Sequence, residues 1–292
     1  MSIAPTLLAV PNVSEGGDPA VLEALAAAYA RAGARVLDVH GDADHGRSVF
    51  TLAAPPRTLA DALVAGAREA VARIDLRAHG GLHPHVGALD VAPVVFLDDD
   101  RRGAACAEAL VVADRLGEEA GVPVLLYGVL SGPPPRTRAE LRRGGPAGLA
   151  RRIAAGELRP DFGPPAPHPT AGTTLVAARP PLVAFNLELA PPATAGDARR
   201  IAAAVREGGA DGLPGVRAIG LALGSRGGVA QVSCNVEDHR AVPLARLLDA
   251  VQRHAAVAEA ELVGLAPRAA LAGWPDGVPI RNRAVLEDLL RS

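Results

Sequence analysis

Apolar and polar positions follow two alternating periods along the first hundred residues. Short apolar runs predict β-strands at residues 7–10, 35–39, 48–53 and 91–97. The pair Asp18-Pro19 is typical of a helix start, and the Ala-rich stretch after it predicts a helix to about Arg31. Leu59, Leu63 and later apolar residues to Ile74 recur at helical spacing and predict a second helix. The predicted order is therefore β-α-β-β-α-β.

The rest of the chain predicts a few more elements and then the same order again. We expect a helix at 101–120, a strand at 122–127, a helical stretch at 137–155 and a Pro/Gly-rich linker at 156–173. The second half predicts strands at 182–187, 216–223, 229–235 and 261–264, with helices at 197–207 and 242–258. We therefore predict an α+β protein of two tandem ferredoxin-like (βαββαβ) subdomains, residues 1–180 and 181–292, with a ligand cleft between them.

Composition removes several classes of function. The chain of 292 residues contains no lysine, which excludes Schiff-base chemistry and a Walker-type phosphate loop. A net charge of −2 and only 2% aromatic residues argue against nucleic-acid binding. Cys106 and Cys234 stand apart in apolar surroundings and are expected to be buried thiols in a reducing cytosol. With no apolar stretch of membrane-spanning length and no basic leader, we expect a cytoplasmic protein that binds no membrane.

Histidines are concentrated in one region. Five of the eight lie between residues 40 and 85, and His79, His83 and His85 fall within a single Gly- and Pro-containing segment. Imidazole is the side chain best suited to proton transfer near neutral pH, and a rigid loop could hold it toward a cleft. The alternatives are surface histidines in a turn, or a zinc site formed by these three histidines and Asp90. No second ligand cluster supports zinc, so we expect no metal.

Two further segments carry candidate chemistry. Residues 159–173 could be a proline-stiffened linker. They could also form a rigid wall for a flat, partly polar heterocycle, offering the imidazole of His168, the ring of Phe162 and free N–H groups at Gly163, Ala171 and Gly172. Asn12, Ser14 and Glu15 follow the first strand, where polar groups commonly face a site, although helix capping explains Ser14 equally well.

An ordered series of short motifs resembles one known family, the formiminotransferase domain of glutamate formimidoyltransferases and formimidoyltransferase-cyclodeaminases. The series covers nearly the whole chain, from about residue 7 to 272. It comprises residues 10–16, 37–39, 47–51, 74–77, 83–84, 87–91, 122–128, 160–164, 172–173, 178–179, 184–186, 216–220, 230–235 and 262–265. Each motif alone is unspecific, whereas the ordered series is specific. The chain ends where that domain ends, so we expect no fused cyclodeaminase domain.

The resemblance implies a tetrahydrofolate-dependent enzyme of histidine breakdown that moves a formimidoyl group from N-formimidoyl-L-glutamate to N5 of tetrahydrofolate. It implies two α/β subdomains with a substrate tunnel, a tendency to form homodimers, and tetrahydrofolate as co-substrate. The family's catalytic histidine falls on His83. Its folate-contacting stretch falls on Gly163, Pro164, Pro165, Ala166, Pro167, His168, Pro169, Thr170, Ala171 and Gly172. Our candidate substrate-binding residues are Asn12, His40, Arg47, His79, His85, Asp90, Arg179 and Arg226, the arginines because carboxylates favour forked guanidinium partners.

The chain departs from the family near the reacting centre. Leu82 stands where the family usually has Glu, His85 where it has Arg, His40 where it has a second acid, and Gly46 where it has Asn. His40 or Asp90 could replace the missing acid beside His83. These changes mark a divergent member. They leave open one-carbon transfer from a different donor, or a folate-binding protein without catalysis.

Overall fold

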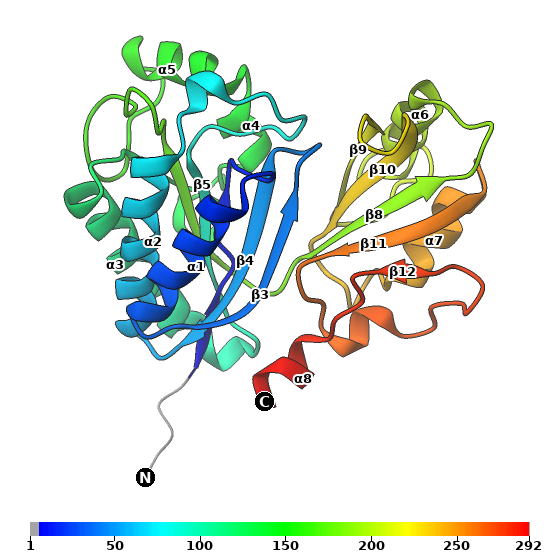
Figure 1. The fold of residues 1–292 in the computed structure, drawn as a ribbon, viewed down its shortest axis with the longest axis horizontal. Helices are drawn as coiled ribbons and strands as arrows, with labels where there is room; N and C mark the ends of the chain where they lie inside the picture. Colours follow the sequence, from blue (N-terminus) through cyan, green and yellow to red (C-terminus); the bar gives the residue numbers. More distant parts are fainter. Residues whose placement is uncertain (1–5, 292) are drawn as a thin grey trace. The chain divides into compact units, whose positions relative to one another are not determined.

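The computed structural model describes residues 6–291 of the chain (Figure 1). The chain divides into two compact units, Met1–Pro180 (unit 1) and Pro181–Ser292 (unit 2). Each unit has its own β-sheet and its own buried apolar core. The protein is therefore a mixed α+β protein with two sheets. None of the helices within residues 6–291 is long and apolar enough to cross a membrane.

Unit 1 contains a seven-stranded sheet with helices on both faces. Its strands are β1 Leu7–Ala9, β2 Asn12–Val13, β3 Arg35–Asp42, β4 Arg47–Ala54, β5 Leu89–Val95, β6 Val124–Leu126 and β7 Thr174–Arg179. Its α-helices are α1 Pro19–Arg31, α2 Thr58–Arg73, α3 Arg102–Glu119, α4 Arg138–Arg142 and α5 Gly145–Ala154. β3 pairs with β4, and β1 and β2 both lie between β4 and β5, all antiparallel. β7 and then β6 extend the sheet beyond β5 as parallel strands.

Alternating side chains divide the core of unit 1 between the two faces of the sheet. Ala92 and Val94 of β5 pack with α1, α2 and α3, which lie side by side in Figure 1. Val91 belongs to a second cluster that includes Leu141 of α4 and Leu149 of α5. α4 and α5 therefore cover the opposite face of the sheet, at the end formed by β5, β7 and β6.

The helix start predicted at Asp18 is confirmed, and its geometry explains why α1 forms. The Asp18 carboxylate accepts from the N–H groups of Ala20 and Val21, and Pro19 occupies the first helical position. Leu25, Ala28 and Tyr29 then bury one face of the helix. The capping pair and the apolar stripe agree, which is why this element could be predicted from sequence.

The first strand is shorter than predicted. The apolar run at 7–10 breaks at Val10-Pro11, because proline has no N–H for the sheet, and the chain re-enters the sheet as β2. Asn12 thus lies within a strand and not in a loop after one. Its backbone pairs with Val49 of β4 and Val91 of β5, which holds the side chain at the centre of the sheet.

The segment at 156–173 is not a linker between the two halves. It lies within unit 1, where Val124 donates to the carbonyl of Phe162 (2.9 Å) and Asp161 donates back to Val124 (2.8 Å). Phe162 packs against the main core. The many prolines therefore stiffen a packed connection into β7. Upstream, the helical stretch at 137–155 is two helices, because the chain turns at Gly144 and Gly145, which both have positive φ.

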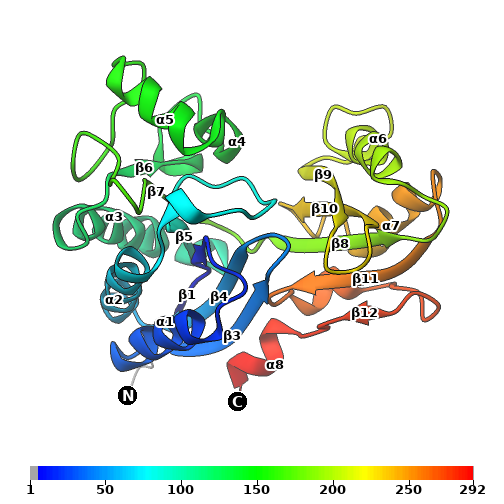
Figure 2. The ribbon, with the colours of Figure 1, turned by 45° about the horizontal axis from the view of Figure 1, so that its top comes forward.

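Unit 2 contains a five-stranded sheet in the order β12-β11-β8-β10-β9. Its strands are β8 Val183–Leu189, β9 Val216–Leu223, β10 Val229–Val236, β11 Val257–Val263 and β12 Ile280–Arg281, and its α-helices are α6 Ala195–Val205, α7 Leu244–Gln252 and α8 Leu286–Arg291. Phe185 and Leu187 of β8 are both buried with residues of α6 and α7 in one core. The ribbons of β8, α6 and α7 are labelled in Figure 2. Only the short β11–β12 pair is parallel.

The helix predicted at 242–258 is too long. α7 ends at Gln252, and β11 already begins at Val257. A register irregularity between Val257 and Glu259 interrupts the alternation of apolar and polar residues in β11. The first residues of this strand therefore resemble the continuation of a helix in the sequence. The two cysteines are free thiols. Cys234 is buried, as expected, whereas Cys106 is only half-buried.

Candidate active site

The backbone around His83 is tied to the turn between β3 and β4. The N–H of Leu82 donates to the carbonyl of Asp44 (3.0 Å), and the N–H of His83 donates to the carbonyl of His45 (3.2 Å). A Cβ atom at Gly81 would lie 2.3 Å from the His45 carbonyl oxygen, so only glycine permits this approach. The turn between β3 and β4 therefore fixes the backbone position of His83.

The imidazole of His83 is held by a chain of polar contacts from the sheet. Its Nε2 atom lies 2.6 Å from Nη1 of Arg47, at the start of β4. Nη2 of Arg47 donates to the side-chain oxygen of Asn12, whose amide donates to the carbonyl of Val10 (2.9 Å). Because a guanidinium group can only donate, Nε2 of His83 is the acceptor. The ring is therefore neutral in this arrangement, with its proton on Nδ1.

The electrostatic surroundings favour the same neutral form. Burial holds the pKa of His83 well below its ordinary value, and the nearby charges of Arg47 and Arg142 lower it further. Burial also lowers the pKa of Arg47 to about 9, with Arg142 as the next contributor. His83 is thus unprotonated at neutral pH and able to accept a proton.

Asp90 is a structural anchor of the site. It lies on β5, is 2% exposed, and accepts from the N–H of Val86 (2.8 Å). Its other oxygen forms an ion pair with Arg142 of α4. The aspartate thereby connects the segment after His83 to α4. Arg142 was not a sequence candidate, because it stands in an arginine-rich stretch with no sign that this helix meets β5.

The remaining histidines of the region form two ring pairs. His45 stacks on His83 with 6.3 Å between ring centroids, and His79 packs edge-on against His85 at 4.1 Å. His40 lies on β3, opposite Val49 of β4, and burial lowers its pKa. Within residues 6–291, no three His, Cys, Asp or Glu side chains are arranged to hold a metal ion.

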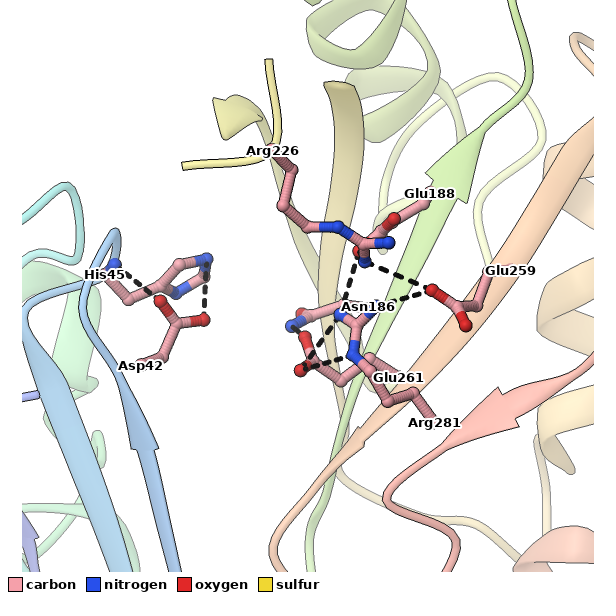
Figure 3. A network of polar contacts seen from close by, with 8 residues as sticks. All are labelled: Asp42, His45, Asn186, Glu188, Arg226, Glu259, Glu261 and Arg281. Atoms are coloured by element: carbon pink, nitrogen blue, oxygen red, sulfur yellow. Dashed lines mark hydrogen bonds and ion pairs between the residues drawn. The ribbon is translucent and has the colours of Figure 1, made fainter. Parts of the chain in front are cut away.

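Two of the candidate arginines have other partners. Arg226 lies in unit 2, where its guanidinium contacts Glu188 (2.5 Å) and Glu259 (3.1 Å) in a network with Arg281 (Figure 3). Its charge is already balanced by carboxylates of its own unit. Arg179 ends β7 in unit 1 and donates to the carbonyl of Pro180 (3.0 Å), while its charge acts on Arg47.

In the segment Gly163 to Gly172, two backbone N–H groups that were expected from the sequence to be free are hydrogen-bonded within the segment. Ala171 donates its N–H to Nδ1 of His168 (3.0 Å), and Gly172 donates to the His168 carbonyl (2.9 Å). Neither N–H is therefore free, contrary to expectation, because the segment satisfies its own donors in a tight turn. The turn is joined to the segment after His83, since Ala88 donates to Ala171 (2.8 Å) and Thr173 to Val86 (2.9 Å).

Comparison with known proteins identifies the class. The sequence matches the family description "Formiminotransferase domain, N-terminal subdomain" over residues 6–179, and "Formiminotransferase domain" over residues 184–274. It is 36% identical over 269 residues to glutamate formimidoyltransferase of Streptococcus pyogenes serotype M1, covering 90% of this chain and 89% of that protein. The corresponding enzyme of Thermoplasma acidophilum is 34% identical over 271 residues, covering 90% and 88%.

A bifunctional relative shows the same match over part of its length. Formimidoyltransferase-cyclodeaminase of Gallus gallus is 38% identical over 274 residues, which is 90% of this chain and 50% of that protein. The chain thus spans about half the length of the bifunctional relatives. It belongs to the formiminotransferase family, whose members are transferases, and the resemblance read from the ordered motifs is confirmed.

Proposed function

We propose that this protein transfers the formimidoyl group of N-formimidoyl-L-glutamate to N5 of tetrahydrofolate, with His83 as the general acid and base. The observation that carries the proposal is the neutral imidazole of His83, whose Nε2 accepts from Arg47 in a site that lowers its pKa. The names of the relatives, glutamate formimidoyltransferase above all, support the choice of donor.

The proposed reaction needs one proton acceptor that then becomes a donor. N5 of tetrahydrofolate attacks the formimidoyl carbon and forms a new N–C bond. His83 takes the proton that the positively charged N5 loses, and delivers it to the glutamate nitrogen as the old C–N bond breaks. The products are 5-formimidoyltetrahydrofolate and L-glutamate. For Nε2 to take the proton, the Arg47 N–H has to give up its contact with the ring.

We assign tetrahydrofolate to the segment Gly163 to Gly172, as the resemblance implies. Two backbone bonds support the assignment: Ala88 donates to Ala171 within the segment, and Thr173, directly after it, donates to Val86, so the segment is held against the chain that follows His83. Pro165 and Pro169 are exposed and offer apolar surface, whereas Ala171 is buried and reaches no ligand with its side chain.

A second candidate function is folate binding without transfer, or transfer from another donor. It is favoured by Leu82, which stands where the family usually has an acid and is 48% exposed. Beside His83, the arginines and His45 all lower the basicity of the ring, and no carboxylate stands at residue 82 to raise it. The departures at His40, Gly46 and His85 are the other changes that could select a different donor.

An activity assay separates these possibilities. Purified protein, N-formimidoyl-L-glutamate and tetrahydrofolate are mixed, and 5-formimidoyltetrahydrofolate is followed by absorbance while L-glutamate is measured separately. We expect turnover by the wild type and by the control His254→Gln, a histidine of unit 2 that contacts Asp211. His83→Gln should lose turnover and keep tetrahydrofolate affinity. Folate binding without turnover in the wild type would refute glutamate-specific transfer, and other formimidoyl or formyl donors would then be screened.

We also propose a ferredoxin-like core for each unit. In unit 2 the pairing order β11-β8-β10-β9 supports this, and β5, β1/β2, β4 and β3 follow the same order in unit 1. The homodimer and the cytoplasmic location expected from the sequence stay predictions.

A further inference from the structure

The charges of Arg47, Arg138 and Arg142 all act on His83, and Asp90 is the carboxylate that pairs with Arg142. Arg138 and Arg142 both lie on α4, which Asp90 connects to the segment after His83, and their charges act on His83 and on Arg47. Asp90 forms an ion pair with Arg142. The side chains of Arg47, Arg138, Arg142 and Asp90 together carry a net charge of +2, and the positive charge of Arg179 also acts on Arg47.

Arg138 has no anionic partner among residues 6–291. It lies four residues before Arg142 on α4, a spacing that puts both side chains on the same face of the helix. Its guanidinium carbon lies 5.9 Å from the ring centroid of Tyr127, and no carboxylate of residues 6–291 lies within ion-pair distance. The Tyr127 side chain is buried, 6% exposed, and its hydroxyl has no hydrogen-bond partner in the described part of the chain. The Tyr127 hydroxyl and the Arg138 guanidinium thus lie together with no hydrogen-bond acceptor between them among the described residues.

Arg47 also lacks an anionic partner in direct contact among the described residues. Its terminal nitrogens reach only the neutral partners Asn12 and His83, and its buried Nε has no partner among the residues that the structure describes. The buried Nε of Arg142 is likewise unpartnered. Partly buried like charges repel one another and are costly without a counter-charge. The arrangement is the one expected of a site that an anion completes.

We propose that Arg138, together with Arg47 and Arg142, binds the two carboxylates of the amino-acid donor. This inference rests on the proposed function, and it adds Arg138 and Arg142 to the substrate-binding residues. A glutamyl group carries two negative charges, which would balance the excess positive charge of these arginines, and guanidinium groups hold carboxylates in forked geometry.

Tetrahydrofolate itself ends in a glutamyl group, so the same chemistry has two sources. The donor fits better because of the distance from the reacting atoms. In the donor, the α-carboxylate is two bonds from the nitrogen that carries the formimidoyl group, whereas in tetrahydrofolate an aminobenzoyl group separates the glutamyl carboxylates from N5. Arg47 contacts the imidazole of His83 directly. Carboxylates bound by this cluster therefore belong to the molecule whose reacting carbon lies beside His83.

The test compares Arg138→Gln with Arg143→Gln, a matched loss of one charge at an exposed arginine five residues further along the chain. We expect Arg138→Gln to raise the KM for N-formimidoyl-L-glutamate about 10- to 100-fold, the usual effect of a charge-assisted hydrogen bond. The kcat and the KM for tetrahydrofolate should stay within about threefold. Arg138→Lys should recover part of the loss. With N-formimidoyl-L-alanine, which lacks the side-chain carboxylate, the difference between wild type and variant should shrink.

Calorimetry with L-glutamate makes the test independent of turnover. Glutamate binding that Arg138→Gln loses and Arg143→Gln keeps supports the dicarboxylate site even if the wild type transfers nothing, in which case only the proposed function fails. A raised KM for tetrahydrofolate that disappears with tetrahydropteroate, which has no glutamyl group, would assign the cluster to folate and overturn the inference. Unchanged KM values and unchanged glutamate affinity in Arg138→Gln would also overturn it.

Discussion

Asp90 is expected to contribute more to the stability of unit 1 than any exposed carboxylate, because it holds two largely buried groups, the Arg142 guanidinium and the Val86 N–H. Its ion-pair partner Arg142 has a side chain that is only 11% exposed, and Asp90 itself is 3% exposed by side chain. Removing one member of a buried ion pair costs about 3–5 kcal/mol. Asp90→Asn keeps an acceptor for the Val86 N–H and loses the charge. We therefore expect it to lower the free energy of unfolding by about 3 kcal/mol, the low end because Arg142 keeps some contact with water.

Asp90→Ala should cost more than Asp90→Asn, since the buried N–H of Val86 then loses its acceptor as well. The additional loss is about 1–3 kcal/mol. Asp90→Asn combined with Arg142→Met should recover most of the stability, because replacing both partners of a buried pair leaves no isolated charge. The double variant therefore separates an ion pair from two independent effects.

Urea denaturation measures these differences. Far-UV circular dichroism follows both units, whereas the fluorescence of Trp274, the single tryptophan, follows unit 2. At an m-value of about 2 kcal/mol/M, a loss of 3 kcal/mol lowers the midpoint by about 1.5 M. A stabilising buried ion pair is refuted if Asp90→Asn changes the free energy of unfolding by less than about 0.5 kcal/mol, or if the double variant is as unstable as the single one.

Two other predictions concern acid sensitivity and core packing. Because the pKa of His83 is lowered in the folded protein, the unfolded chain binds more protons between that pKa and the ordinary value of 6.5. Stability should therefore fall as pH drops below 6.5, and His83→Gln should reduce the slope by up to about 1.4 kcal/mol per pH unit in urea melts; equal slopes would contradict the lowered pKa. Gly66→Ala should destabilise unit 1 by about 1–3 kcal/mol, because its Cβ would lie 2.0 Å from Cε1 of the fully buried Tyr29. Gly103→Ala, which meets open space on α3, is the control, and a similar loss there would refute the steric explanation.

The sequence predicted local structure well where capping and burial agree, as at Asp18 and Pro19 of α1. The sequence-based prediction was wrong where a contact between distant residues determines the local structure. The prolines at 156–173 indicate a linker until Phe162 is seen to pack against the core of unit 1. The same segment was expected to present the N–H groups of Ala171 and Gly172, which the backbone and ring of His168 accept instead.

The candidate site was predicted in part. His83 and Arg47 were both sequence candidates, and the structure places them in contact. Arg142, which pairs with Asp90, and Arg138, which we propose binds the donor, were not sequence candidates, since a spacing of four residues shows a shared helix face but not that this face meets β5. His85 was a substrate-binding candidate; its ring packs on His79 and its Nδ1 lies 3.2 Å from the His83 carbonyl oxygen, while the ring of His83 stacks on His45. Which histidine rings pair depends on the fold and cannot be predicted from their spacing in the sequence.

The turn between β3 and β4 has a consequence for how this protein can change during evolution. Hairpin turns at a surface usually accept insertions and deletions without harm. Here the carbonyls of Asp44 and His45 set the backbone of Leu82 and His83, so the length of the hairpin determines where the imidazole stands. An added residue between Asp42 and Arg47 would displace the imidazole of His83 while leaving both strands intact. We expect this hairpin to be among the least length-variable segments of any active descendant, despite its position at the end of two strands.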